Sequence, residues 1–428
     1  MISDAATLPD WIRRDADGRL VGDDLPFADL AERFGTPTYV YSRTAIERTW
    51  RAFERACEGR NVQICYAMKA NSTLGIVDCF ARLGAGFDIV SAGELERVLA
   101  VGAGADRVIF SGVGKSGAEI RRALEAGVHC FNVESESELA RIDRIAGTLG
   151  MRAPISLRVN PDVDAATHPY ISTGLKQNKF GIAHEKAVSV YLGATRMKHV
   201  EVVGIDCHIG SQITEIAPFL AALDKVLALV DELRSHGITM RHLDLGGGLG
   251  IRYDAETPPS PQALMDAIFA RIDAWCPRDP PKVLFEFGRA LVGEAGVLLT
   301  RVEYLKENHG KRFAVVDASM SELLRPALYQ AWHGVAPVLA RAGVPGRYDL
   351  VGPVCESGDW LAKDRALVLE EGDLLVLLSA GAYGAVMSSN YNTRTRPAEL
   401  LVAGGVVDVL RPRETVASLL SQEQVPGR

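Results

Sequence analysis

Polar residues follow several short apolar runs of this sequence, at the point where each run ends. The first is Lys69, which closes the run at 62–68. Asn132 and Glu134 close the run at 128–133, and Arg158 and Asn160 close the run at 155–159. The others are His208 and Ser211 after 201–207, Gly246, Gly247 and Gly248 after 241–245, and Glu286 and Arg289 after 282–287. Amine, imidazole, carboxylate and guanidinium groups in equivalent positions indicate one shared site.

Lys69 is a candidate for covalent chemistry. A lysine at the end of an apolar strand is partly removed from water, which lowers its pKa and leaves a neutral amine able to attack a carbonyl. A lone lysine at such a position more often extends its charged end into solvent. The other polar residues at the same ends favour the first interpretation, and Schiff-base chemistry is its natural use.

The three glycines indicate a phosphate site. Backbone N–H groups of a glycine turn can approach an oxyanion closely. The need for a tight left-handed backbone turn would explain the three glycines about as well. A second glycine-containing stretch, Ser111 to Ser116, resembles a nucleotide-binding loop. Ile109 stands where that loop needs glycine, so we predict no nucleotide site there.

Glu286 and His208 suit a flat aromatic cofactor. A carboxylate at the end of an apolar strand needs a cationic partner, and a protonated pyridine nitrogen is one. His208 could be an interior histidine, but beside Lys69 it is better explained as a ring that stacks on the cofactor. Amine, phosphate cradle, carboxylate and stacking ring together predict pyridoxal 5′-phosphate, whose reactions are decarboxylation, racemisation and transamination of amino acids.

Eight strand-like runs alternate with helical segments in the first two-thirds of the chain. The runs are 62–68, 86–90, 107–111, 128–133, 155–159, 201–207, 241–245 and 282–287. Helical patterns follow the first seven, at 74–83, 92–101, 116–126, 135–149, 184–193, 216–236 and 261–275, with a less clear one after the eighth. This alternation predicts a (β/α)₈ barrel over 45–290, whose active site lies at the carboxyl ends of the strands.

The remainder predicts a mostly β domain over 291–428. Its strand-like runs are 299–305, 312–318, 347–351, 366–369, 374–379, 399–403 and 406–410. Residues 1–44 contain one more β-type run, Thr38 to Ser42, so we expect this amino-terminal segment to join the β domain.

Composition excludes several classes of protein. The chain has 428 residues, 47% hydrophobic and 24% charged, with a net charge of −7, so disorder and nucleic-acid binding are not expected. The longest apolar stretch, 374–387, is shorter than the ~18 residues of a membrane helix, and the amino terminus lacks a signal-peptide pattern. Seven cysteines without a CxxC pair indicate reduced thiols in the cytoplasm and no metal site.

Six motifs resemble the fold-type III pyridoxal-phosphate decarboxylases along nearly the whole chain. They are Tyr66-Ala67-Met68-Lys69-Ala70-Asn71, His208-Ile209-Gly210-Ser211, Asp244-Leu245-Gly246-Gly247-Gly248-Leu249-Gly250, Arg325-Pro326-Ala327-Leu328-Tyr329, Gly352-Pro353-Val354-Cys355-Glu356-Ser357-Gly358-Asp359 and Gly381-Ala382-Tyr383-Gly384. In the order found here, these motifs are highly specific.

The resemblance implies a role for each site residue. Lys69 holds the cofactor covalently, His208 stacks on it and Glu286 pairs with its ring nitrogen. Cys355 returns a proton to the α-carbon after CO₂ leaves, reaching the site from the second subunit of a homodimer. The other implied cofactor contacts come from Ser211, Gly247, Gly248, Phe287, Gly288, Arg289 and Tyr383, of which Ser211, Gly248 and Tyr383 hold the phosphate.

The implied substrate is meso-2,6-diaminopimelate, which would give L-lysine and CO₂ in the last step of lysine biosynthesis. Its far end carries an ammonium and a carboxylate. Glu356 can bind the ammonium, whereas Arg289 or Arg325 can bind the carboxylate with help from Tyr329. Tyr383 is expected to contact substrate as well as cofactor.

One position departs from the family pattern, and several functions remain as alternatives. Phe287 replaces the proline of the usual Glu-Pro-Gly-Arg, which restores a backbone N–H and should make the loop less rigid. The alternatives are decarboxylation of ornithine, arginine or carboxynorspermidine, an amino-acid racemase, a non-catalytic cofactor-carrying barrel, and a Schiff-base aldolase without cofactor.

Overall fold

The computed structural model describes residues 7–163 and 178–426. The chain divides into two compact units. The β unit comprises Met1–Arg48, Arg252–Glu256 and Leu291–Arg428, and the barrel unit comprises Thr49–Ile251 and Thr257–Ala290. The short segment Arg252–Glu256, which the sequence placed inside the barrel, therefore groups with the β unit.

Eight parallel strands close into the predicted barrel. They are β5 Val62–Ala67, β6 Gly86–Ile89, β7 Val108–Phe110, β8 Cys130–Val133, β9 Ala153–Asn160, β11 Val200–Asp206, β12 His242–Asp244 and β13 Lys282–Phe287. Each pairs with the next in this order, β13 pairs with β5, and the two-residue strand β10 (Ile182–Ala183) adds to β9. The (β/α)₈ prediction is confirmed.

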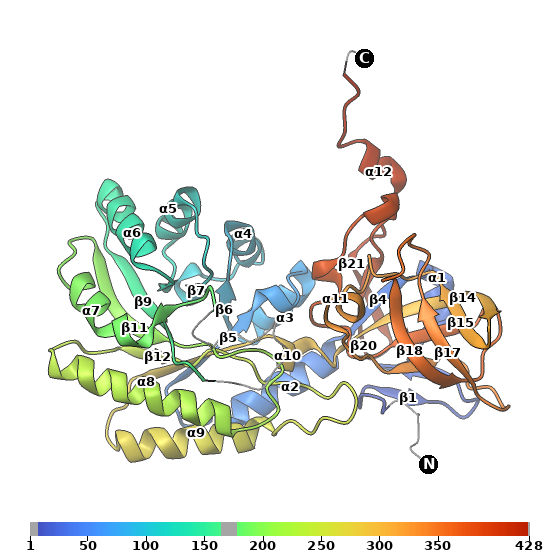
Figure 1. The fold of residues 1–428 in the computed structure, drawn as a ribbon, viewed down its shortest axis with the longest axis horizontal. Helices are drawn as coiled ribbons and strands as arrows, with labels where there is room; N and C mark the ends of the chain where they lie inside the picture. The colour runs from blue at the N-terminus through green and yellow to red at the C-terminus, as the bar shows by residue number, and fades with distance from the viewer. Residues whose placement is uncertain (1–6, 164–177, 427–428) are drawn as a thin grey trace. The chain divides into compact units, whose positions relative to one another are not determined.

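Helices cover the outside of the strands, as Figure 1 shows for α4 to α9. They are α3 Leu74–Arg82, α4 Ala92–Ala100, α5 Gly117–Ala126, α6 Glu136–Leu149, α7 His184–Ala194, α8 Ala217–Ser235 and α9 Pro261–Trp275, with α2 Arg43–Ala56 before β5 and the short α10 Arg289–Val292 after β13. Ser91, Ser116 and Ser135 each accept a hydrogen bond from a first-turn N–H of the following helix. These caps fix where the loops at the carboxyl ends of the strands end.

The barrel interior is apolar at one level and polar at another. Cys65, Ile109, Cys130, Val203 and Leu284 form a buried cluster contributed by five different strands. Buried polar residues lie at or near the carboxyl ends of six of the barrel strands; they are Asp88, Ser111, Asn132, Asp206, Asp244 and Glu286. Charged groups are retained inside a barrel only when they pair or bind a ligand, so this layer marks the functional end.

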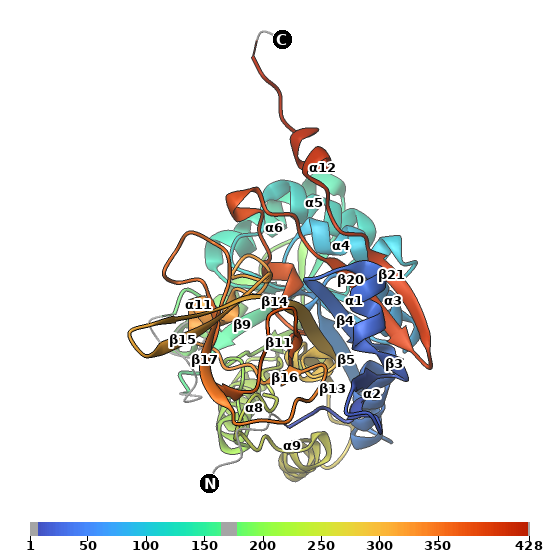
Figure 2. The ribbon, with the colours of Figure 1, turned by 90° about the vertical axis from the view of Figure 1, so that its right-hand side faces the viewer.

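The β unit contains a sheet with the order β18-β17-β15-β14-β4-β20-β21. Its strands are β4 Thr38–Ser42, β14 Gly296–Asn308, β15 Lys311–Val316, β17 Gly346–Val351, β18 Trp360–Leu367, β20 Ala398–Ala403 and β21 Val406–Arg411, with β19 Leu374–Leu377 and β16 Val335–Pro337 pairing off this path. As predicted, β4 joins this sheet, antiparallel to β14 and parallel to β20 (Figure 2).

Several elements of the β unit were not predicted. A small sheet forms from β1 Ile12–Arg14, β2 Leu20–Gly22 and β3 Leu25–Pro26, followed by α1 Phe27–Phe34. Two short helices, α11 Arg325–Tyr329 and α12 Val416–Leu420, complete the described part together with 3₁₀ turns. Among residues 7–163 and 178–426, no helix is long and apolar enough to cross a membrane.

Candidate active site

Lys69 lies in the 3₁₀ turn Met68–Ala70, directly after β5. Its Nζ is 2.8 Å from Oδ2 of Asp88 on the neighbouring strand β6, and its side chain is 35% exposed. The other carboxylate oxygen of Asp88, Oδ1, is buried and accepts no hydrogen bond from the described residues. Asp88 therefore holds the amine of Lys69 at the carboxyl end of the barrel.

Glu286 belongs to a cluster of three buried carboxyl groups. Its Oε1 accepts hydrogen bonds from Ser111 Oγ and Asn132 Nδ2, both at 3.3 Å. Carboxylate oxygens of Asp206, Asp244 and Glu286 all lie within 4.8 Å of one another. Three ionised groups cannot remain so close in a dry interior, so the cluster retains at least one proton.

Burial and mutual repulsion set the pKa values of this cluster. Burial, followed by the charges of Asp244 and Asp88, raises the pKa of Glu286 well above its usual value. Burial likewise raises the pKa of Asp244 to about 6, although the backbone N–H of Gly246 donates to it and partly opposes the rise. Both groups are therefore protonated more readily than an ordinary carboxyl group, and Glu286 is the one that burial and its neighbours affect most.

Arg158 balances part of this negative charge. Its Nη1 is 2.9 Å from Glu134 Oε1, and its Nε is 3.9 Å from Asp206 Oδ2. Glu134 also accepts a hydrogen bond from the backbone N–H of Gly181 at 2.6 Å. Arg158 and Glu134 thus form a buried support for the site.

The glycine turn after β12 has no room for side chains. Gly246 and Gly248 have positive φ angles of 64° and 104°. A Cβ on Gly247 would overlap the carbonyl oxygen of Glu286, and one on Gly248 would overlap that of Gly210. Glycine is therefore required here, and backbone N–H groups can approach a ligand closely.

His208 lies against this turn. The backbone N–H of Gly247 donates to its Nδ1 at 3.3 Å, so the proton of the neutral ring resides on Nε2. Burial, with the positive charges of Arg158 and Lys69, lowers the pKa of His208 well below its usual value. A neutral ring that lies against the glycine turn is consistent with stacking on a flat cofactor.

Ser211 and Arg289 form the other side of this group. Ser211 Oγ accepts hydrogen bonds from Arg289 Nε at 3.3 Å and Nη2 at 3.0 Å. Arg289 begins α10 directly after Gly288, where a Cβ would lie 3.0 Å from that of Ala70. A hydroxyl held by a buried guanidinium beside a glycine turn suits a phosphate ester.

Phe287 is the last residue of β13 and is 1% exposed. Its ring lies 4.5 Å from that of Phe53 and 5.4 Å from that of Phe285. Aromatic packing therefore holds the position where the family usually has proline. The loop gains a backbone N–H there and is anchored by the buried ring.

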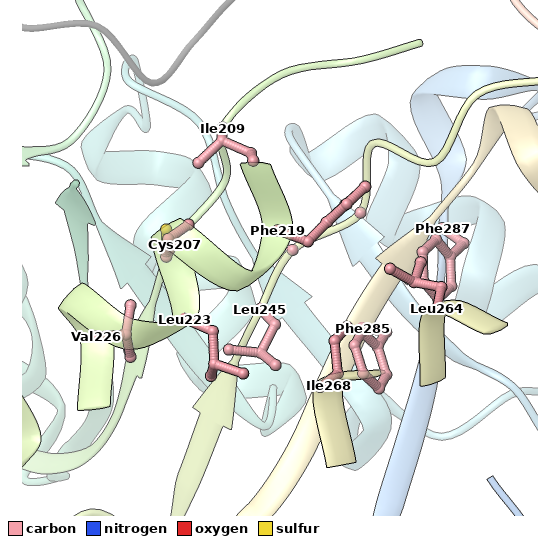
Figure 3. Close-up of a pocket in the computed structure, with 13 residues that line it drawn as sticks. Cys207, Ile209, Phe219, Leu223, Val226, Leu245, Leu264, Ile268, Phe285 and Phe287 are labelled. Carbon is pink, nitrogen blue, oxygen red and sulfur yellow. The ribbon is translucent and has the colours of Figure 1, made fainter. Parts of the chain in front are cut away.

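A small apolar cavity lies behind the glycine turn, with a volume of about 20 Å³. Figure 3 shows its lining, which comes from the ends of β11, β12 and β13 and from α8 and α9. The labelled residues are Cys207, Ile209, Phe219, Leu223, Val226, Leu245, Leu264, Ile268, Phe285 and Phe287. The lining carries no charge, so the cavity belongs to the packing layer that supports the turn.

The remaining predicted residues lie in the β unit. Arg325 begins α11, is 6% exposed and places Nη1 2.8 Å from His333 Nε2. Tyr329 ends the same five-residue helix, so the two residues, four apart, lie on one face of it. Tyr383, in the Gly-Ala-Tyr-Gly motif, adopts a positive φ of 55°.

Cys355 and Glu356 are both exposed in the β unit. The backbone N–H of Cys355 donates to Asn392 Oδ1 at 3.4 Å, and Glu356 raises the pKa of Tyr391 by charge and by hydrogen bonding. Asp359 fixes the loop by accepting hydrogen bonds from the backbone N–H groups of Val354 and Met320. The loop therefore presents an accessible thiol on a held backbone.

The structure thus brings together the predicted residues of the barrel, and in the β unit it places Arg325 and Tyr329 on one short helix and Cys355 and Glu356 on a separate exposed loop. Sequence reasoning missed Asp88 and Asp206, and it quoted Asp244 without a role. Each ends or nearly ends an apolar strand, which is the signal that identified Glu286. Tyr253 and His333, which hold Arg325, gave no such signal.

The barrel residues fit pyridoxal phosphate. The site offers an amine on Lys69 and a carboxyl cluster that can face a ring nitrogen. It also offers a glycine turn with exposed backbone N–H groups, whose positions leave no room for a Cβ. The three carboxylates are close enough to ligate a metal ion, but the guanidinium of Arg158 already faces Asp206. A protonated aromatic nitrogen therefore suits the cluster better than a metal.

Comparison with known proteins agrees with this fit. The family profile of the pyridoxal-dependent decarboxylase, pyridoxal binding domain, matches residues 43–293. Fold and site therefore define a pyridoxal-dependent decarboxylase, which confirms the predicted cofactor.

Relatives narrow the class further. A diaminopimelate decarboxylase of Pseudomonas aeruginosa is 59% identical, covering 96% of this chain and 98% of its own length. One of Vibrio cholerae is 55% identical over 97% of this chain and 99% of its own. The solved diaminopimelate decarboxylase of M. jannaschii in co-complex with L-lysine has a TM-score of 0.93 at 38% identity, covering 98% and 99%. The chain belongs to the diaminopimelate decarboxylase family.

Proposed function

We propose that this chain catalyses the pyridoxal 5′-phosphate-dependent decarboxylation of meso-2,6-diaminopimelate to L-lysine and CO₂, the last step of lysine biosynthesis. One observation carries the proposal: Lys69 and Glu286 lie at the carboxyl ends of the neighbouring strands β5 and β13, in a chain similar over nearly its full length to diaminopimelate decarboxylases. A cytoplasmic location is part of the proposal, supported by seven free thiols.

The barrel residues would hold the cofactor. When bound, pyridoxal phosphate supplies an electron sink for the electron pair left at the α-carbon as CO₂ departs. Lys69 would bind it through Nζ, and Asp88 would take up the charge of that amine whenever it is released. Glu286 would face the ring nitrogen, His208 would stack, and Ser211, Gly247, Gly248, Phe287, Gly288, Arg289 and Tyr383 would complete the contacts.

Charges in the β unit would select the substrate. Arg325, with Tyr329, supplies a buried cation for the far carboxylate, and Glu356 supplies an anion for the far ammonium. Arg289 and Tyr383 are the remaining proposed substrate contacts. A diamine precursor such as ornithine lacks the far carboxylate. With such a substrate bound, the guanidinium of Arg325 would have no carboxylate to pair with, which costs binding free energy in a closed site.

Cys355 would return the proton to the α-carbon. Its exposure within one chain leaves the thiol accessible to a second copy, which supports a homodimer in which each site uses two chains. We expect Cys355→Ala to keep bound cofactor but to turn over slowly. Unchanged turnover would exclude the thiol as the proton donor.

The reaction is tested by incubating the purified protein with pyridoxal phosphate and meso-diaminopimelate. We expect CO₂ and L-lysine by chiral chromatography, and little CO₂ from ornithine, arginine or carboxynorspermidine. A product that retains both carboxylates would indicate a racemase instead. Equal turnover of the four substrates would refute the proposed selection.

Shared sites are tested by mixing two strongly impaired variants, Lys69→Ala and Cys355→Ala. Random exchange of subunits in a homodimer gives half heterodimers, each with one intact site, so about a quarter of wild-type activity should return. No recovery after demonstrated subunit exchange would show that each chain builds its own site.

A further inference from the structure

Two aromatic side chains of the β unit contact the guanidinium of Arg325, one by a hydrogen bond and one through the face of its ring. His333 Nε2 lies 2.8 Å from Arg325 Nη1, and the ring centre of Tyr253 lies 4.4 Å from Arg325 Cζ. The rings of Tyr253 and His333 pack edge to face, with centres 5.3 Å apart and an interplanar angle of 78°. Tyr253 comes from Arg252–Glu256, which explains why this short segment groups with the β unit.

The hydrogen bonds of His333 determine its protonation state. A guanidinium can only donate and a carbonyl can only accept. His333 Nδ1 lies 2.8 Å from the carbonyl oxygen of Leu378, so Nδ1 carries the proton, and the lone pair of Nε2 accepts from Arg325. A second proton on His333 would replace this bond by two facing N–H groups and two positive charges.

Two further groups contact His333. Tyr253 packs edge to face against its ring, and Nη2 of Arg365, from β18, donates to the His333 carbonyl at 3.0 Å. The His333 side chain is 0% exposed. Its neutral form is therefore the one that the fold holds.

We propose that neutral His333 is a positioning residue that orients Arg325 toward the far carboxylate of the substrate, through the chain Leu378 carbonyl, His333 and Arg325. This inference rests on the proposed function. Fixing one N–H and one face of the guanidinium sets its plane, and a carboxylate must meet that plane edge-on to accept two parallel hydrogen bonds. Substrate recognition, and not cofactor binding, should therefore depend on His333.

A matched pair of variants separates the two hydrogen bonds. In His333→Asn the amide nitrogen can replace Nδ1 and donate to Leu378, but no acceptor reaches Arg325. In His333→Gln the side-chain oxygen can reach the position of Nε2 and accept from Arg325. We expect His333→Asn to raise KM for meso-diaminopimelate by at least about tenfold. His333→Gln should stay nearer to wild type, and the cofactor Kd should change in neither variant.

Equal KM values for the two variants, or a parallel loss of cofactor affinity, would overturn the inference. A double-mutant cycle combines His333→Asn with Arg325→Gln. If His333 acts through Arg325, His333→Asn should raise KM only slightly in the Arg325→Gln background. Fully additive effects would overturn the role of His333. An unchanged KM in Arg325→Gln, with decarboxylation intact, would instead overturn the proposed substrate role of Arg325.

A second comparison keeps the inference testable if His333→Asn, which replaces a fully buried side chain, fails to fold. Folded His333→Gln, with native far-UV circular dichroism, should keep a KM for meso-diaminopimelate close to that of the wild type, whereas Arg325→Gln should raise KM by about tenfold or more. A KM of folded His333→Gln as high as that of Arg325→Gln would refute the positioning role of His333.

Discussion

Asp244→Asn is the most direct perturbation of the buried carboxyl cluster. Asparagine keeps the shape, and its Oδ1 can still accept from the N–H of Gly246, as Asp244 Oδ1 does at 3.0 Å. The pKa of Asp244 is raised from 3.8 to about 6, so its folded form prefers the proton. That difference corresponds to about 3 kcal/mol of stability that the native state loses when Asp244 ionises.

The sign follows from the direction of the pKa change. A carboxyl group whose pKa rises on folding binds more protons in the native state, so the free energy of unfolding falls as pH increases. For Asp244 this loss begins near pH 3.8 and is complete above about pH 6. Between about pH 4.5 and 7.5 the wild type should therefore lose about 2 kcal/mol more than Asp244→Asn.

Urea unfolding of the cofactor-free proteins across this pH range measures the difference. Hydrogen exchange of peptides from β12 and β13 reports on the barrel unit by itself. Asp106→Asn, which changes an exposed carboxylate of the same barrel unit, is the control and should follow the wild type. If Asp244→Asn shows the same pH dependence as the wild type, the three carboxyl groups do not share protons as inferred.

Three further variants test the barrel site. Lys69→Ala should retain no cofactor after borohydride treatment and gel filtration, because no amine remains to bind it; a retained chromophore would contradict the assignment. Gly247→Ala should weaken cofactor binding by more than about tenfold, because its Cβ overlaps the Glu286 carbonyl, whereas Gly193→Ala, which faces open space, should bind normally in the same titration. Arg158→Met should lower the free energy of unfolding in urea by about 3–5 kcal/mol, because it leaves buried Glu134 and Asp206 unpaired. A loss no larger than that of Arg122→Met, at an exposed ion pair, would show that Arg158 is not such a support.

The barrel could be predicted because local signals agree with the fold. Its strands are apolar runs, and several of its helices begin at serine caps that the sequence shows directly. Lys69 and Glu286 could be predicted because a charge at the end of an apolar strand has few explanations. The same logic would have found Asp206, had every acidic residue at a strand end been considered.

Other features depend on partners far apart in the chain. His333 follows Arg325 by eight residues, and nothing in that spacing indicates a hydrogen bond, since the turn through Gln330 at a positive φ of 53° brings them together. Tyr253 lies within the barrel's sequence yet packs in the β unit. Strand β16 escapes prediction because its three residues stand outside the strand–helix alternation that marks the equally short β7 and β12.

The position of β4 has a consequence for synthesis of the chain. Its partners in β14 and β20 lie about 260 and 360 residues later, so the amino-terminal segment emerges from the ribosome long before either exists. The last barrel strand, β13, ends at Phe287. In the β unit, β4 cannot pair with β20 until the chain has been made as far as Ala403. Nascent chains should therefore acquire a protease-resistant barrel first, whereas β4 lacks its partner β20 until translation is nearly finished.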